Sequence, residues 1–214
     1  MKILCIADEV DPLVYSPRIK ERFGDVDLVL GAGDLPSEYL DFISSMLNCP
    51  LLYVEGNHDA HERPNPLSWA RFAFPPEEGA RNIGFRVIRE GGLTILGLPG
   101  SLRYNRGPNQ FSDFSMALRI VALAPRLLLE RIFRGRALDI VLTHASPQGI
   151  QDRDDPCHRG FRSYTRLIHF WKPRWFVHGH VHLYDLAEER ASSVEGTTVV
   201  NAFGHWIIET EEKK

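Results

Sequence analysis

Six side chains that can bind a metal ion stand at the end of a short apolar run or just after one: Asp8, Asp34, Asn57, His144, His180 and His182. Their ligand atoms are oxygen and nitrogen, a donor set that suits manganese, iron or zinc. His180 and His182 alternate with Gly179 and Val181, so both rings can point the same way from an extended segment. The set as a whole predicts a metal site.

Each of these residues also has an ordinary structural interpretation. Asp8 and Asp34 can start a loop or cap a helix. Asn57 can belong to a glycine turn, and His144 can be a hydrogen-bonded loop histidine. It is the combination that favours a metal site, because packing alone does not explain so many metal-binding groups at the ends of strand-like runs.

The first part of the chain alternates strand-like and helix-like segments. The apolar run KILCIA ends at Asp8, VDLVLGAG ends at Asp34, and PLLYVEGNHD leads to His58. The segments SPRIKERF and SEYLDFISSMLN between them predict helices, with Ser16 and Ser37 as their caps. This order predicts parallel strands with right-handed crossovers, and open α/β sheets carry their sites at the carboxyl ends of such strands.

The rest of the chain predicts further strands around one long helix. FRVIREGGLTILGLPG predicts a hairpin, and FSMALRIVALAPRLLLERIF predicts a helix with a break or kink at Pro125. ALDIVLTHASP and PRWFVHGHVHL predict two more strands, and LYDLAEER, TTVVNAF and HWIIET predict the antiparallel end of a second sheet. Long irregular regions are candidates for function, and they span about Ala60–Arg81, Gly100–Gln110 and Gln148–Arg162.

Length and charge limit what the chain can be. With 214 residues, we expect one domain over residues 1–214. The 25 basic and 28 acidic residues give a net charge of −3, so we expect no nucleic-acid partner. The apolar start MKILCIAD is too short for a signal peptide and no run reaches roughly 18 apolar residues, so we expect a cytoplasmic protein with no membrane partner. Three cysteines predict reduced thiols, and the oligomeric state stays open.

Four short motifs resemble, in order and spacing, those of the calcineurin-like metallophosphoesterase superfamily. They are GD at Gly33–Asp34, GNHD at Gly56–Asp59, TH at Thr143–His144 and GHVH at Gly179–His182. The resemblance covers most of the chain, from Ile3 to about Phe203. It implies an α/β fold in which a two-sheet β sandwich is flanked by helices in four layers, α/β/β/α, with a two-metal centre at the ends of the strands.

The resemblance implies that the six ligands above hold one or two divalent ions, manganese, iron or zinc. Asp34 would bridge two ions, because a carboxylate can offer one oxygen to each. The other ligands would divide between the ions, with Asp8 and His182 on the first and Asn57, His144 and His180 on the second.

The resemblance also implies the reaction, which is metal-dependent hydrolysis of phosphate esters by a metal-activated water. Small phosphodiesters or nucleotides would be the substrates. His58 would sit beside the phosphate, where it stabilises the transition state or protonates the leaving oxygen, and Asp59 would hold its ring.

The first motif departs from the family pattern. The family has Asp-x-His, whereas this chain has Asp8, Glu9 and Val10. Because valine cannot bind a metal, the first site loses an imidazole unless Glu9, Asp11 or water replaces it. The centre could then be dinuclear, mononuclear or no longer catalytic. The alternative to an enzyme is therefore a degenerate relative that binds a nucleotide or a protein partner.

The loop LPGSLRYNRGPNQFSD is the candidate for substrate binding. The loop, which carries Arg103, Tyr104 and Asn105, could place a guanidinium on a phosphate and an aromatic ring under a base or sugar. Arg103 and Asn105 are the predicted substrate-binding residues. The alternative is an exposed loop with ordinary polar residues. A nuclease or a protein phosphatase is a further alternative, and the near-neutral charge argues against polynucleotide substrates.

Overall fold

The computed structural model describes residues 1–59, 79–185 and 188–210. One sheet has the strand order β13-β1-β2-β3-β4. Its strands are β1 (Lys2–Ala7), β2 (Leu28–Gly31), β3 (Leu51–Tyr53), β4 (Arg81–Asn82) and β13 (Gly204–Glu209). Strands β1, β2 and β3 are parallel, as the sequence predicts. The short strand β4, which is not predicted, is parallel to β3, and β13 pairs antiparallel with β1. The segment HWIIET therefore belongs to this first sheet, and its predicted place in the second sheet is wrong.

The second sheet has the strand order β11-β12-β10-β9-β6-β5. Its strands are β5 (Arg86–Glu90), β6 (Leu93–Leu98), β9 (Ile140–Thr143), β10 (Trp175–His178), β11 (Ala191–Val194) and β12 (Thr197–Asn201). The four central strands are parallel, and β5 and β11 form antiparallel edges. The predicted hairpin is confirmed as β5 and β6. A separate short pair joins β7 (Ser101–Leu102) to β8 (Gln110–Phe111).

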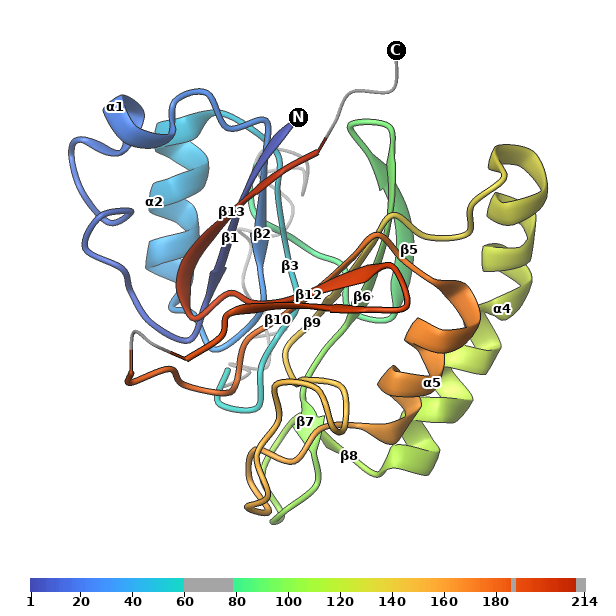
Figure 1. The fold of residues 1–214 in the computed structure, drawn as a ribbon. Coiled ribbons are helices and arrows are strands. Elements are labelled where there is room, and N and C mark those ends of the chain that lie inside the picture. Colours follow the sequence, from blue (N-terminus) through green and yellow to red (C-terminus); the bar gives the residue numbers. More distant parts are fainter. Residues whose placement is uncertain (60–78, 186–187, 211–214) are drawn as a thin grey trace, which may run out of the picture.

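Helices cover the outer faces of both sheets, which gives four layers (Figure 1). Helices α1 (Ile19–Phe23) and α2 (Ser37–Leu47) pack on the first sheet, and α4 (Asp113–Arg134) and α5 (Arg162–Trp171) pack on the second. A third apolar cluster, with Ile3, Val54 and Val177 among its members, lies between the two sheets. This arrangement confirms the predicted two-sheet α/β fold, and it brings the carboxyl ends of the parallel strands to one edge.

Local signals predict the details of the helices less well. Helix α4 is continuous through Pro125, so the predicted break is wrong. Pro125 has no amide N–H to donate to the carbonyl oxygen of Val121, four positions earlier. Because Val121 is 66% exposed, water can bond to that oxygen instead. Ser16 and Ser37 are not caps, because α1 begins after Arg18 and α2 starts at Ser37 itself.

Two further expectations concern cysteines and membranes. All three cysteines are free, as predicted, although only Cys5 is fully buried and Cys157 lies in the loop before α5. Within the described parts of the chain, no helix has the length and apolar character needed to cross a bilayer.

Candidate metal centre

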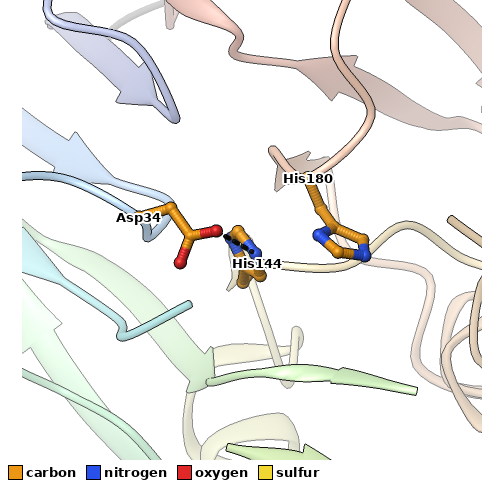
Figure 2. Close-up of side chains that lie close together, drawn as sticks. All are labelled: Asp34, His144 and His180. Atoms are coloured by element: carbon orange, nitrogen blue, oxygen red, sulfur yellow. Dashed lines mark ion pairs between the residues drawn. The ribbon is translucent and has the colours of Figure 1, made fainter. Parts of the chain in front are cut away.

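Three of the predicted ligands converge from both sheets at one point. The ligand atoms of Asp34, His144 and His180 all lie within 4.8 Å of one another (Figure 2). Asp34 follows β2 in the first sheet, whereas His144 follows β9 and His180 follows β10 in the second. His144 Nε2 lies 3.3 Å from Asp34 Oδ2. This arrangement suits a metal ion held between the two sheets.

The atoms that meet at this point are acceptors that require a cation between them. His144 is fully buried, and its Nδ1 lies 2.8 Å from the carbonyl oxygen of Ala32, to which it donates. In a neutral imidazole, Nε2 then carries a lone pair. That nitrogen faces Asp34 Oδ2 and also Asn57 Oδ1, the latter at 3.0 Å. A proton or a metal ion must lie among the three, since unshielded lone pairs would otherwise repel one another.

The pKa shifts of Asp34 and His144 indicate that, without a metal ion, a proton lies between these two side chains. Burial tends to raise the pKa of Asp34, but the hydrogen bond and charge of His144 outweigh it, so the pKa is lowered. Burial tends to lower the pKa of His144, but the Asp34 carboxylate outweighs it and raises the pKa. The pair therefore shares a proton, which a metal ion bound by the same atoms would have to displace.

Three predicted ligands have left-handed backbone conformations, which non-glycine residues rarely adopt. The φ angles are 63° for Asp8, 55° for Asp34 and 66° for His180. Hydrogen bonds across the strand ends hold two of them: the amide of Asp8 donates to the Gly33 carbonyl at 3.1 Å, and the amide of His180 donates to the Asp8 carboxylate at 3.0 and 2.9 Å. Such conformations concentrate at functional sites, where the surrounding structure enforces them.

The glycines of the motifs are required by close approach. A Cβ atom on Gly56 would lie 2.0 Å from Asp34 Oδ1, and one on Gly179 would lie 2.5 Å from Asp8 Oδ2. A Cβ on Gly33 would lie 2.6 Å from His144 Nδ1. Each glycine thus lets a backbone pass directly against a metal-binding side chain.

Asp8 and His182 lie beside this group and are less tightly joined to it. The side chain of Asp8 is 1% exposed, and burial raises its pKa to about 7. His182 Nε2 lies 3.9 Å from Asp8 Oδ1, and its Nδ1 lies 3.0 Å from the Tyr184 hydroxyl. His180 Nε2 donates to the Cys157 carbonyl at 2.7 Å, and burial lowers the pKa of His180 to about 3. His180 is therefore neutral, the form that binds metals.

Comparison with known proteins identifies the family. A sequence model of calcineurin-like phosphoesterases matches residues 1–184. The chain belongs to the calcineurin-like phosphoesterase family. No curated protein matches it in sequence.

Solved structures match the fold of this chain. One has a TM-score of 0.64 at 17% identity, over 97% of this chain and 94% of the other. A second, TT1561 of Thermus thermophilus, has a TM-score of 0.62 at 16% identity, over 95% of this chain and 89% of the other. A third, an archaeal phosphodiesterase, covers 100% and 96% at 17% identity, with a TM-score of 0.47. At these identities the likeness concerns the fold alone.

The structure places Val10 and the two residues that could replace the missing imidazole, Glu9 and Asp11. Val10 packs against the apolar cluster under α1 and α2. Asp11 is engaged elsewhere, since one carboxylate oxygen lies 2.5 Å from His205 Nδ1 and the other accepts from the Leu13 amide at 2.8 Å. Asp11 is therefore no substitute ligand in this conformation, and Glu9 is exposed.

His58 and Asp59 border a cavity next to Asp34. The cavity has a volume of about 420 Å³ and is also lined by Ser37 and Tyr53. The amide of His58 donates to Asp34 Oδ1 at 2.8 Å. Asp59 Oδ2 accepts from the backbone amide of Asp34 at 3.0 Å and also from that of Gly56. Asp59 thus ties two motif turns together, and no contact with the His58 ring is found among the described residues.

The two residues predicted to bind substrate are occupied in holding their own loop. Arg103 donates to the Gln110 carbonyl at 3.4 Å, and Asn105 Oδ1 accepts from Gln110 Nε2 at 2.7 Å. Tyr104, which lies between them, reaches the centre instead, because its hydroxyl accepts a hydrogen bond from Asn57 Nδ2 at 3.1 Å. The sequence marks this loop as long and irregular, but spacing does not reveal which side chain faces the site.

Proposed function

We propose that this protein hydrolyses phosphate esters, with small phosphodiesters or nucleotides as substrates, and that it uses one or two divalent ions. The observation that carries the proposal is the convergence of three lone pairs, on Asp34 Oδ2, Asn57 Oδ1 and His144 Nε2, at a buried point. Oxygen and nitrogen ligands of this kind suit manganese, iron or zinc. A bound ion would lower the pKa of a water molecule and polarise the phosphate.

The proposed ligands fall into two groups. Asn57, His144 and His180 would hold one ion together with Asp34. Asp8 and His182 would serve a second ion on the other side of the same carboxylate. The first group is supported by the 4.8 Å cluster and by the 3.0 Å contact of Asn57 with His144. The second is supported by the burial of the Asp8 carboxylate, since a buried carboxylate is stabilised by a nearby cation.

His58 would act on the substrate rather than on a metal. Its backbone amide donates to the Asp34 carboxylate, and the residue lines the cavity next to that carboxylate. An imidazole there can donate a hydrogen bond to a phosphate oxygen or a proton to the leaving oxygen. Arg103 and Asn105 remain predicted substrate contacts, and Tyr104 is added to them because it bonds to Asn57.

The first experiment measures hydrolysis of bis(p-nitrophenyl) phosphate by chelator-stripped protein as manganese is added back. Variants His144→Ala and His58→Ala are compared with His169→Ala, which removes an exposed histidine on α5. We expect a manganese-dependent rate that His144→Ala abolishes together with metal binding. His58→Ala should lower the rate and retain the metal, and His169→Ala should change neither.

The opposite result would favour the degenerate relative suggested by Val10. If the folded wild-type protein binds manganese, iron or zinc but hydrolyses neither a diester nor a monoester, the site is a binding site without turnover. If it binds none of these ions, the proposed metal centre itself is wrong.

A further inference from the structure

The loop between β9 and α5 holds a histidine–aspartate pair that the four motifs do not include. His158 Nδ1 lies 2.9 and 3.0 Å from the two carboxylate oxygens of Asp155. The same carboxylate accepts from the backbone amides of His158, at 3.1 Å, and Cys157, at 3.0 Å. The imidazole is therefore oriented by a carboxylate that is itself fixed by the turn.

This pair lies against the histidines of the GHVH motif. The ring centroids of His158 and His180 are 5.3 Å apart. The neighbouring Cys157 carbonyl accepts from His180 Nε2 at 2.7 Å, and Arg153 donates to the His182 carbonyl at 2.8 Å. One loop thus contacts both.

The hydrogen bonding of His158 is that of a metal ligand. A histidine that binds a metal usually donates its other ring N–H to a carboxylate or a backbone carbonyl, which fixes the tautomer. His144 does so with Ala32, and His180 does so with Cys157. His158 does so with Asp155, and within the described part of the chain its Nε2 has no hydrogen-bond partner. Its side chain is 35% exposed.

A histidine–carboxylate pair is not by itself evidence of a metal ligand, because the protein has other pairs of this kind. His169, in the last turn of α5, is 48% exposed and lies 2.9 Å from Glu195 in the turn between β11 and β12. His205 pairs with Asp11 next to Phe23. Only His158, among the described pairs of this kind outside the motifs, has its ring in contact with a predicted ligand.

We propose that His158 is a further metal ligand and supplies an imidazole that the Asp8-Glu9-Val10 motif lacks. This inference rests on the proposed metal centre. Val10 has no donor atom, and Asp11 is bound to His205. His158 lies next to His180, and its loop also reaches His182, a proposed ligand of the first ion, through Arg153. The Nε2 atom of His158 is the proposed donor. With His158, the centre would have one imidazole more than the four sequence motifs supply.

Metal binding tests the inference apart from activity. Chelator-stripped protein is loaded with manganese, passed through a desalting column and analysed for ions per chain, and affinities are measured by calorimetry. We expect His158→Ala to lose one ion per chain or to bind it at least tenfold more weakly. Asp155→Asn, which keeps the shape of the side chain, should weaken the same ion by about tenfold, as loss of an outer partner does. His169→Ala is the matched control, and thermal unfolding verifies that each variant is folded.

Cobalt-loaded protein gives a direct count of imidazole ligands. Each bound histidine that carries a proton on its other nitrogen produces one exchangeable, paramagnetically shifted N–H proton resonance in NMR. His158→Ala should remove one such resonance and His169→Ala none.

Two outcomes would overturn the inference, and they differ. If wild-type protein binds metal and His158→Ala keeps the same stoichiometry, affinity and resonances, His158 is not a ligand, whereas the proposed function stands. If wild-type protein binds no metal, both fail.

Discussion

Replacing Gly56 by alanine should damage the metal centre more than the fold. The added Cβ would lie 2.0 Å from Asp34 Oδ1 and 2.8 Å from the Asp34 amide nitrogen, whereas real Cβ contacts essentially never fall below 3.0 Å. Asp34 or the turn must therefore move by about 1 Å or more. Asp34 cannot move freely, because its carboxylate also contacts His144 Nε2 and the His58 amide.

The size of the effect follows from this displacement. A misplacement of about 1 Å at a reacting centre can lower the rate about 10²-fold. We therefore expect Gly56→Ala to lower phosphodiester hydrolysis by about that factor and metal affinity by at least about tenfold. Overpacking costs about 1–3 kcal/mol of unfolding free energy, which leaves a domain of ordinary stability folded.

The assay for Gly56→Ala combines manganese titration, the rate of diester hydrolysis and thermal unfolding. Gly79→Ala is the control, because a Cβ there meets no atom of the described residues within 4 Å and the backbone is not left-handed. It should match the wild-type protein in all three measurements. The reasoning is refuted if Gly56→Ala is folded, binds metal with wild-type affinity and hydrolyses the diester at the wild-type rate.

Two further predictions concern the ligands and their partners. Metal binding should release protons at pH 7, because the pKa of His144 is raised by Asp34 and burial raises that of Asp8 to about 7, whereas both must be deprotonated to bind. Metal affinity should thus rise with pH through neutrality, which calorimetry in buffers of different ionisation enthalpy can measure; an affinity independent of pH between about 6 and 9 would contradict it. Tyr104→Phe should weaken metal binding several-fold, because Asn57 Nδ2 loses its 3.1 Å acceptor and the amide is freer to rotate. An unchanged affinity in the same titration would show that Tyr104 does not orient Asn57.

The sequence predicts the strand ends well, because apolar runs that stop at a polar residue are a local signal. Asp34 and His144 therefore reach one point as expected. The partners of these residues are not local. Asp11 pairs with His205, 194 positions away, and no spacing rule predicts that contact. For the same reason, the sequence predicts that the loop before α5 is irregular, but it does not predict that His158 lies against His180.

Local sequence patterns also do not predict which sheet a strand joins. The segment HWIIET is typical of a strand in any sheet, and only its pairing with β1 decides which one. Proline likewise predicts a helix break from local geometry alone. Helix α4 continues past Pro125, with Met116 and Leu127 buried before and after the proline. Packing on both sides can offset the lost hydrogen bond.

The left-handed backbone conformations of three predicted ligands give a physical reason why these residues are not ordinary turn residues. Asp8, Asp34 and His180 each occupy a conformation that costs about 1–3 kcal/mol for a residue with a side chain. Glycine would adopt each conformation at no steric cost, and the chain already uses glycine at the adjacent Gly33 and Gly179. Side chains with metal-binding atoms thus stand where a turn alone would favour glycine, at the junction of the two sheets. A bound ion would offset this cost, since any ligand that binds only the folded state stabilises it, by about 2.7 kcal/mol at a hundredfold excess over its dissociation constant.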